Sequence, residues 1–221
     1  FKTHKNFKMI HVSTDEVYGD IKKFKKSKEG DRYQPSSPYS ASKASSDHFV
    51  RAWNKTYGLK TIITNCSNNY GIWQFPEKLI PVVIAKCLKK ESIPIYGNGT
   101  NIRDWIYVED HILALLKILK YGKFSETYNI GANQEISNIE LVKRICSIFD
   151  EYYPDNSSFQ DLIQFVKDRP GHDFRYSINS KKLNEDLNFK PQHTLESGLK
   201  LTIDWYIKNK SWLFEKSSKK I

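Results

Sequence analysis

The chain has 221 residues, of which 35 are lysine or arginine and 25 are aspartate or glutamate, giving a formal net charge of +10. A hydrophobic fraction of 39% and five tryptophans exclude a disordered chain and predict one or two folded domains. No run of about 18 apolar residues exists, which excludes a membrane-spanning helix, and residues 1–5 precede no apolar signal region. We therefore expect a soluble, cytoplasmic protein.

The positive charge favours anionic partners such as phosphorylated metabolites. Five of the seven positions from Lys22 to Lys28 are lysine, and three more lysines stand close to the C-terminus. Both runs are typical of solvated loops or tails. Since no helix-turn-helix, zinc finger or RNA-recognition pattern accompanies them, we expect no nucleic-acid partner.

The three cysteines are widely spaced, and neither a CxxC pair nor a pair of histidines at ligand spacing accompanies them. The sequence therefore predicts no metal site. Free cysteines are most often small buried hydrophobic residues, and we expect the same here. They are Cys66, Cys87 and Cys146.

The hydrophobic pattern alternates between short β-branched runs and longer helical stretches. Gly58 and Gly122 end two of the helices, and Ser137 with Glu140 has the spacing of a capping box. Ile112, Leu115, Leu116 and Leu119 form one apolar stripe of a helix. In chain order we expect a strand over 8–13, a helix over 39–57, a strand over 61–66, a helix over 80–90, an extended segment over 93–96, a helix over 109–121, a strand over 126–130 and helices over 137–149, 180–187 and 194–209. This order predicts an α/β fold with a mainly parallel, Rossmann-like sheet.

A glycine-rich turn that would hold a pyrophosphate at a helix N-terminus is missing from the sequence. The 221 residues thus offer no evident place for the adenosine half of a dinucleotide. Either the chain is a fragment of a longer gene product, or it lacks the N-terminal part of the sheet.

Tyr39 and Lys43 are four positions apart on a predicted helix and therefore share one face. A lysine charge beside a phenol favours the phenolate and would lower the pKa of Tyr39 from about 10. Tyr39 is then a candidate general base for an alcohol. By itself this spacing is common, and an ordinary surface helix also carries it.

The segment from Ser13 to Glu16 follows the first predicted strand. Ligands in α/β folds bind outside the carboxyl ends of the strands, where Asp15 and Glu16 would stand. Of two neighbouring carboxyl groups, one can stay protonated as an acid while the other acts as a base. Taken alone, the segment is also compatible with a solvated turn.

Together these segments resemble the dTDP-glucose 4,6-dehydratases, a family of extended short-chain dehydrogenases. The resemblance spans roughly residues 8–212 and is carried by HVSTDEVYGD (11–20), SPYSASKASSDH (37–48), NCSNNYG (65–71), QFPEKLIP (74–81), RDWIYVED (103–110), TYNIG (127–131), DRPGHD (168–173), ESG (196–198) and WY (205–206). Related sugar epimerases and decarboxylases share the tyrosine–lysine pair but generally lack the Asp-Glu pair. The triplet Thr14-Asp15-Glu16 therefore favours a dehydratase.

The resemblance implies a reaction in three steps on one nucleotide sugar. Tyr39, activated by Lys43, takes the proton of the 4-hydroxyl while a hydride passes from C4 to NAD, and Thr14 hydrogen-bonds that oxygen. Glu16 then removes the C5 proton, and Asp15 protonates the departing 6-hydroxyl. The hydride then returns to C6 and a proton to C5, which gives a 4-keto-6-deoxy sugar, as in dTDP-rhamnose biosynthesis.

The same resemblance implies NAD as cofactor and a dTDP-sugar as substrate. The residues that it places beside NAD are Ser13, Tyr39, Lys43 and Asn69. Those that it places on the substrate are Asn68, Glu77, Lys78, Leu79, Pro94, Ile95, Tyr96, Arg103, Asn138, Asp168, Arg169 and His172. Arginine suits a diphosphate because its donors form a fork that matches phosphate oxygens.

We expect residues 1–65 to form the remainder of a NAD-binding core, and residues 66–221 to form mainly a smaller substrate-binding domain. A segment near 107–130 would return to the core, and the substrate domain would draw on residues 66–106 and 130–190. The helix over 39–57 would form half of a homodimer interface. A UDP-sugar dehydratase or epimerase, and a non-catalytic fragment that binds a nucleotide sugar, are the alternatives.

Overall fold

The computed structural model describes residues 7–22 and 24–218. Residues 1–5, which precede no apolar signal region, lie outside the described residues, and so do Lys23, Lys219 and Lys220 of the two lysine runs. The chain folds as two compact units. Unit 1 contains Phe1–Asn69, Arg103–Glu135 and Asp173–Gln192, and unit 2 contains Tyr70–Ile102, Ile136–His172 and His193–Ile221.

Unit 1 is built on a parallel three-stranded sheet of order β1-β2-β6. Its strands are β1 (Met9–Thr14), β2 (Thr61–Cys66) and β6 (Thr127–Ile130). Thr14 pairs with Cys66, and Cys66 pairs with Ile130, so the carboxyl ends of all three strands meet at one edge. The parallel sheet with helices confirms the predicted Rossmann-like fold.

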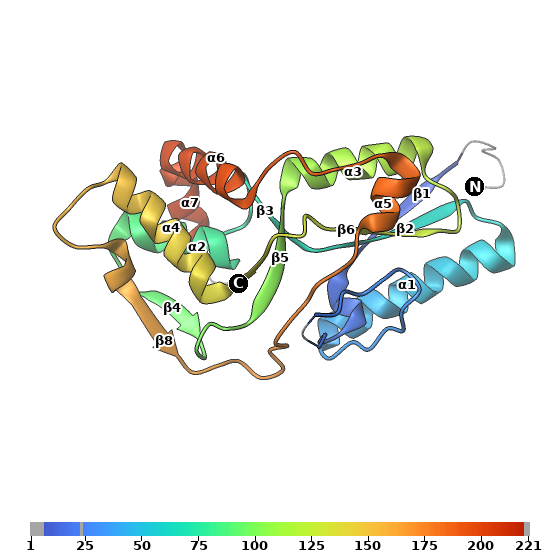
Figure 1. Ribbon diagram of the computed structural model, residues 1–221, viewed down its shortest axis with the longest axis horizontal. Helices are drawn as coiled ribbons and strands as arrows, with labels where there is room; N and C mark the ends of the chain where they lie inside the picture. The colour runs from blue at the N-terminus through green and yellow to red at the C-terminus, as the bar shows by residue number, and fades with distance from the viewer. Residues whose placement is uncertain (1–6, 23, 219–221) are drawn as a thin grey trace. The chain divides into compact units, whose positions relative to one another are not determined.

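Two helices cover opposite faces of this sheet, α1 (Pro38–Tyr57) and α3 (Val108–Tyr121) (Figure 1). Helix α1 begins at a capping box in which Ser37 and Ser40 satisfy each other's backbone amides. It ends at Gly58, whose φ of 68° is the left-handed conformation expected of a C-terminal glycine. These signals explain why the predicted bounds are nearly those observed.

Helix α3 buries its face against β2 and β6 through Ala114 and Ile118. Of the predicted apolar stripe, Leu115 is half-buried, whereas Ile112, Leu116 and Leu119 are exposed. The side of α3 that packs on the sheet is therefore narrower than its apolar pattern. The core cluster consists of Ile62, Ile106, Ala114, Ile118, Tyr128, Ile130, Leu183 and Phe189.

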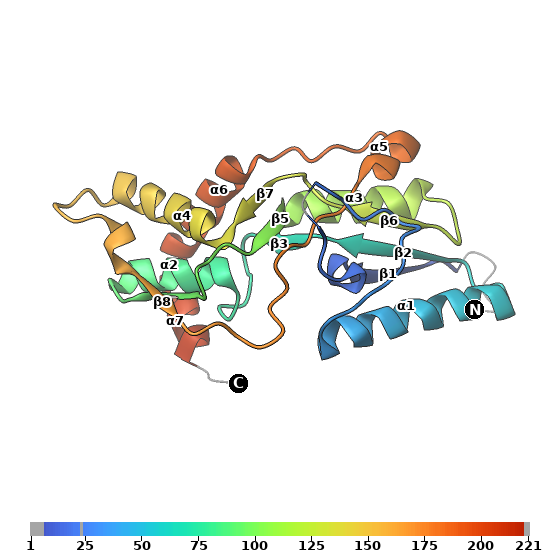
Figure 2. The same cartoon turned by 60° about the horizontal axis from the view of Figure 1, so that its bottom comes forward.

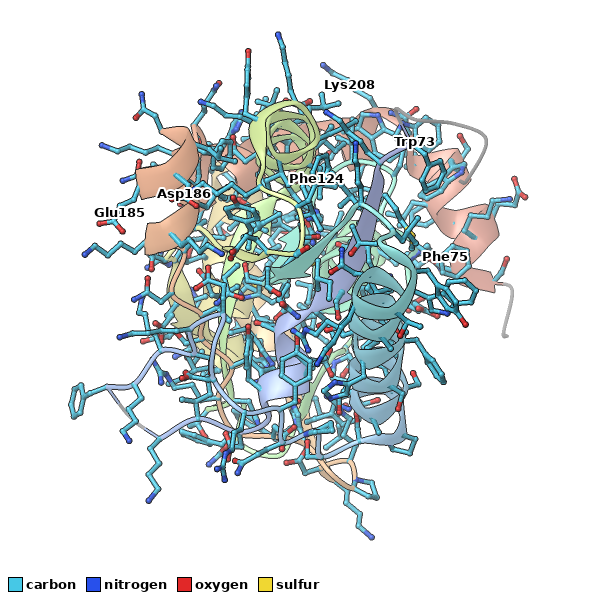
Figure 3. The ribbon with its side chains drawn as sticks, turned by 90° about the vertical axis from the view of Figure 1, so that its right-hand side faces the viewer. Trp73, Phe75, Phe124, Glu185, Asp186 and Lys208 are labelled. Atoms are coloured by element: carbon cyan, nitrogen blue, oxygen red, sulfur yellow. The ribbon has the colours of Figure 1, made fainter. Side chains whose placement is uncertain are left out.

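The segment Asp173–Gln192 belongs to unit 1. The sequence analysis placed most of this segment in the substrate-binding domain instead. The contacts of the segment explain why it belongs to unit 1. Ile178 forms a parallel bridge with Ser27, and α5 (Lys181–Leu187) packs on β6. Figure 3 shows Glu185 and Asp186, both on α5, and Asp186 accepts a hydrogen bond from Tyr128.

The lysine-rich segment is less solvated than its composition predicts. Lys26 is half-buried, with Nζ 2.8 Å from the Asn133 side-chain oxygen and 3.2 Å from a Glu135 carboxylate oxygen. The carbonyls of Lys22 and Lys25 accept hydrogen bonds from the buried Arg175 guanidinium at 3.1 and 2.7 Å. A buried arginine thus organises the backbone of this segment.

Three short strands include the residues at which the chain leaves one unit and enters the other. They are β3 (Asn68–Tyr70), β5 (Ile102–Tyr107) and β7 (Glu135–Ser137), which form a sheet of order β3-β5-β7. The hydrophobic pattern did not predict them.

Unit 2 contains the helices α2 (Leu79–Lys89), α4 (Asn138–Tyr152), α6 (Leu195–Lys208) and α7 (Lys210–Ser218), and the parallel strands β4 (Ile93–Tyr96) and β8 (Ile163–Val166) (Figure 2). Its core packs α2 against α4 and α6, with Ile80, Val83, Leu141 and Ile145 fully buried. Ser137 accepts from the Glu140 amide at the start of α4, at the predicted capping-box position. A short 3-10 turn, Phe159–Leu162, precedes β8.

Three tryptophans of unit 2 form an aromatic cluster. Trp73, labelled in Figure 3, has a left-handed backbone with φ of 62°, and its ring lies 4.6 Å from Trp205 and 5.3 Å from Trp212 between centroids. All three cysteines are free, as expected. Cys87 and Cys146 are buried in unit 2, whereas Cys66 in unit 1 is only half-buried.

Within residues 7–22 and 24–218, every helix is too short or too polar to cross a membrane.

His111 on α3 gives a testable acid sensitivity. It is 7% exposed, and burial lowers its pKa to about 4. The unfolded chain, with a pKa of about 6.5, takes up this proton at a higher pH than the folded chain does. Between pH 6.5 and 4 we therefore expect His111 to remove about 3 kcal/mol from the free energy of unfolding.

Urea unfolding at pH 7 and pH 4.5 checks this. His111→Leu should lose much less stability on acidification than the parent, because it has no proton to take up on unfolding. The exposed His48 provides the control, and His48→Gln should keep the parent's response. Equal acid responses in the parent and His111→Leu would contradict the expectation.

Candidate active site

The segment after β1 brings two carboxyl groups to the carboxyl edge of the sheet. Thr14 caps the 3-10 turn η1 (Asp15–Tyr18), because its hydroxyl accepts a hydrogen bond from the Glu16 amide at 3.3 Å. The turn directs Asp15 inward, where it is 3% exposed, while Glu16 is half-buried. The predicted pair therefore has two different environments.

Asp15 is held as a neutral acid at physiological pH. Burial, the charge of Glu16 and the charge of Asp104 raise its pKa to about 8, although Arg103 opposes them. Its Oδ1 accepts a hydrogen bond from Thr14 at 3.4 Å, whereas its buried Oδ2 has no hydrogen-bond partner within the described part of the chain. A protonated carboxyl group of this kind can donate a proton.

Tyr39 stands at the start of α1, and its side chain is 55% exposed. The predicted lowering of its pKa by Lys43 is wrong for this structure. Burial and the charges of Glu16, Cys66 and Asp15 raise the pKa of Tyr39. The physical reason is that the Lys43 ammonium donates to the Val12 carbonyl at 2.7 Å instead of facing the phenol.

The end of β2 lies beside this group. Cys66 donates to the Ser13 carbonyl at 3.3 Å, and Asn69 donates to the Cys66 sulfur at 3.4 Å. Burial, followed by the charge of Asp15, raises the pKa of Cys66 to about 12, so the thiol stays protonated. Asn68 and Asn69 are both in β3, and both are half-buried.

Arg103 is a buried residue of β5. Its terminal nitrogens donate to the carbonyls of Asp173 and Phe174 at 2.9 and 3.2 Å, and its guanidinium stacks 4.4 Å from the centroid of the Tyr176 ring. The Tyr176 hydroxyl donates to Asp173. Burial, Asp173 and the charge of Glu16 raise the pKa of Tyr176.

The predicted substrate residues of unit 2 fall into separate groups. Glu77 forms an ion pair with Lys78 at 2.9 Å, where Lys78 precedes α2 and Leu79 begins it. His172 Nδ1 lies 2.8 Å from Asp168 Oδ1, and the Asp168 carboxylate also receives the Arg169 amide at 2.8 Å. Pro94, Ile95 and Tyr96 form most of β4, and Asn138 begins α4.

Two neighbours of the carboxyl pair were not predicted. Asp104, buried in β5, accepts hydrogen bonds from the amides of Ala132 and Gln134 and helps to raise the pKa of Asp15. Tyr176 reaches the site from a segment more than 150 positions away from Asp15. Asp104 directly follows Arg103 in a motif that carried the resemblance, which is the one signal that could have found it.

Comparison with known proteins identifies the class to which this fold and site belong. The family model described as GDP-mannose 4,6 dehydratase matches residues 1–202. The chain therefore belongs to that family.

Individual relatives narrow the similarity. The chain is 52% identical over 218 residues to dTDP-glucose 4,6-dehydratase of Escherichia coli, covering 95% of this chain and 60% of the relative. A crystal structure of dTDP-glucose 4,6-dehydratase from Bacillus anthracis in complex with NAD superposes with a TM-score of 0.89 at 41% identity, over 97% of this chain and 66% of that one. UDP-glucuronic acid 4-epimerase from Bacillus cereus gives 0.81 at 26% identity, over 91% and 62%. The chain thus spans about 60% of the length of the curated relatives that it matches.

Proposed function

We propose that this chain carries the dehydration machinery of a dTDP-glucose 4,6-dehydratase. The observation that carries the proposal is the pair of unlike carboxyl groups: Asp15 is buried and kept protonated, while Glu16 beside it is half-buried and acts on Asp15 as a negative charge. Elimination of water from a sugar needs an acid and a base together, and this pair provides both.

Each side chain has one task in the proposed reaction. Tyr39 takes the proton of the sugar 4-hydroxyl, with Thr14 as a hydrogen-bond partner of the same oxygen. Glu16 removes the proton from C5, and Asp15 protonates the leaving 6-hydroxyl. Since the pKa of Tyr39 is raised in this structure, Tyr39 needs a nearby positive charge when it acts as a base. Lys43, four positions along α1, supplies that charge if its ammonium leaves the Val12 carbonyl.

The chain's own residues fit one end of NAD. The exposed Tyr39 phenol and the amide of Asn69 stand at the carboxyl edge of the sheet with Ser13 and Lys43, and these four residues would hold the nicotinamide end. NAD, when bound, accepts a hydride from the sugar and returns it.

For the substrate we propose a dTDP-sugar, with Asn68 and Arg103 of unit 1 among its contacts. The dTDP-glucose dehydratases among the relatives support this choice over a UDP-sugar, because their identity exceeds that of the UDP-sugar epimerase.

We further propose a homodimer formed through α1, in a cytoplasmic enzyme. Support comes from the exposed side chains of Phe49, Trp53 and Tyr57 on this helix, an aromatic surface that gains free energy when it is covered.

The test separates oxidation from elimination. Supplied with NAD and dTDP-glucose, the chain should form the 4-keto-6-deoxy sugar. With Asp15→Asn and Glu16→Gln together, NADH absorbance should build up without product, because the 4-hydroxyl is still oxidised but water is not lost. Tyr39→Phe should suppress the NADH signal itself.

Ser45→Ala serves as the control, since Ser45 is exposed on α1 and donates a hydrogen bond to the Ala41 carbonyl of the same helix. It should behave as the parent. Absence of both NADH and product in the parent chain would contradict activity of this polypeptide. Product formation at the parent rate by the double variant would contradict the roles of Asp15 and Glu16.

A further inference from the structure

A buried carboxylate links the helix that carries Tyr39 to the strand end that carries Asp15. Asp47, in the middle of α1, is fully buried, with 0% of its surface exposed. We propose that Asp47 is a positioning residue that holds the Tyr39–Lys43 side of α1 against the carboxyl end of β1. The inference rests on the proposed function and adds to it a residue that does not touch the substrate.

Four side chains converge on the Asp47 carboxylate. Oδ2 accepts hydrogen bonds from the Ser13 hydroxyl at 3.0 Å, the Tyr33 hydroxyl at 2.8 Å and the Asn65 amide at 3.4 Å. His11 Nε2 lies 3.0 Å from Oδ1. Three of the four residues belong to β1 or β2, so the carboxylate joins α1 to both strands.

Asp47 lies on α1 one to two turns after Tyr39 and Lys43, the two residues of the helix that are proposed to take part in catalysis. Asp47 follows Lys43 by four positions and Tyr39 by eight, which puts all three on one side of the helix. Lys43 makes a second attachment to the same strand through the Val12 carbonyl. Rotation or sliding of α1 would have to break both attachments together.

On the strand side, the network continues to the carboxyl pair. Besides bonding Asp47, the Asn65 amide donates to the Thr14 carbonyl at 3.1 Å. Thr14 in turn caps the turn that directs Asp15 inward. The Asp47 carboxylate is therefore two hydrogen bonds from the backbone that sets the direction of Asp15.

The network also continues along α1 to the next helical turn. Arg51, one turn after Asp47, donates to the Tyr33 hydroxyl at 2.8 Å and stacks 4.9 Å from the centroid of its ring. Tyr33 is thus held by Arg51 while it donates to Asp47. A buried carboxylate is costly unless it is hydrogen-bonded, and here the bonds to Oδ2 come from β1, from β2 and from Tyr33.

If α1 is less firmly held to β1, the Lys43 ammonium should leave the Val12 carbonyl more often and become more reactive. The reactivity of Lys43 therefore tests the attachment without requiring enzyme activity. Trace acylation with acetic anhydride, read by mass spectrometry, compares the reactivity of Lys43 with that of Lys60 in the same molecule. Asp47→Asn keeps the shape but turns a carboxylate oxygen into a donor that faces other donors. We expect Lys43 to react about tenfold faster than in the parent, since hydrogen bonds to a charged group are among the stronger ones lost.

Two further variants keep the test decisive. Tyr33→Phe removes one donor from Asp47 and also the acceptor of the Arg51 hydrogen bond, while the ring is kept. It should raise Lys43 reactivity by about threefold, because the Asp47 carboxylate loses only one of its hydrogen bonds. It replaces Asp47→Asn if that variant fails to fold. Ser177→Ala, a buried change that removes the hydrogen bond to Glu135 and lies outside α1 and β1, should leave Lys43 unchanged. Parent-like Lys43 reactivity in a folded Asp47→Asn or Tyr33→Phe protein overturns the proposal.

The kinetic part of the experiment separates positioning from folding. If the parent converts dTDP-glucose, Tyr33→Phe and Asp47→Asn should lower kcat with little change in KM, because the substrate contacts remain and only the reacting groups move. Equal loss in kcat and in the folded fraction would overturn positioning in favour of a purely structural role. If the parent shows no turnover, the proposed function fails, while the acylation result still decides whether Asp47 holds α1 to β1.

Discussion

Replacing Asp15 by asparagine is expected to raise the free energy of unfolding by about 4 kcal/mol at pH 7, an estimate from the difference in proton affinity between the folded and unfolded chain. The folded carboxyl has a pKa of about 8, against about 3.8 for an unperturbed aspartate. Above pH 4 the unfolded chain releases this proton while the folded chain retains it. Stability therefore falls as pH rises from about 4 to 8, and an asparagine removes that loss.

Urea unfolding from pH 6.5 to pH 8, above the range in which His111 contributes, measures the effect. The parent should lose stability over this range, while Asp15→Asn should stay almost level. Glu16→Gln should weaken the parent's pH dependence, because the neighbouring charge raises the pKa of Asp15. Asp31→Asn, at an exposed position of unit 1, should follow the parent. Parallel curves for the parent and Asp15→Asn would show that Asp15 is ionised in the folded chain.

Such a gain in stability would have a functional cause. An acid that stays protonated at neutral pH has to be buried beside negative charge, and both conditions destabilise the fold. Catalytic residues commonly give the folded protein a lower free energy of unfolding than inert residues at the same positions would. We therefore expect Asp15→Asn to gain stability and to lose the proton donor in the same change.

The sequence predicted best those helices that have capping residues at their own ends. Helix α1 has Ser37 and Pro38 at its start and Gly58 after its end, so its bounds could be read to within one residue. The strands β3, β5 and β7 were missed because three to six residues form a strand only when a partner pairs with them. Helix α7 was also missed, and its polar and apolar residues follow no helical period.

The location of the candidate site could be predicted from the sequence, but the pKa values of its side chains could not. Asp15 and Glu16 could be located because they directly follow a strand of a parallel sheet. The spacing of Tyr39 and Lys43 gave their shared helix face, but the direction of the Lys43 ammonium depends on the Val12 carbonyl of another element. The contribution of Asp104 to the pKa of Asp15 likewise requires three-dimensional proximity. Charge interactions between distant segments leave no trace in local spacing.

Arg175→Met is expected to lower the free energy of unfolding by about 3 to 5 kcal/mol, the usual cost of removing one partner from a buried ion pair. Arg175 is 6% exposed, and its Nε and one terminal nitrogen donate to Glu135 at 2.9 and 2.6 Å. The other terminal nitrogen donates to the carbonyls of Lys22 and Lys25. Methionine fills the space of the aliphatic part but leaves a carboxylate and two carbonyls without these donors.

Urea unfolding gives the global loss, and hydrogen exchange shows where it arises. We expect faster exchange at the amides of Ile21 and Lys25, because the backbone around them is held by the arginine. Combining Arg175→Met with Glu135→Gln should cost less than the sum of the two single changes, since the second removes the charge left unpaired by the first. Arg32→Met, at an exposed arginine of the same region, should change stability by less than about 0.5 kcal/mol. A loss that small for Arg175→Met would mean that the lysine-rich segment is held by contacts other than this guanidinium.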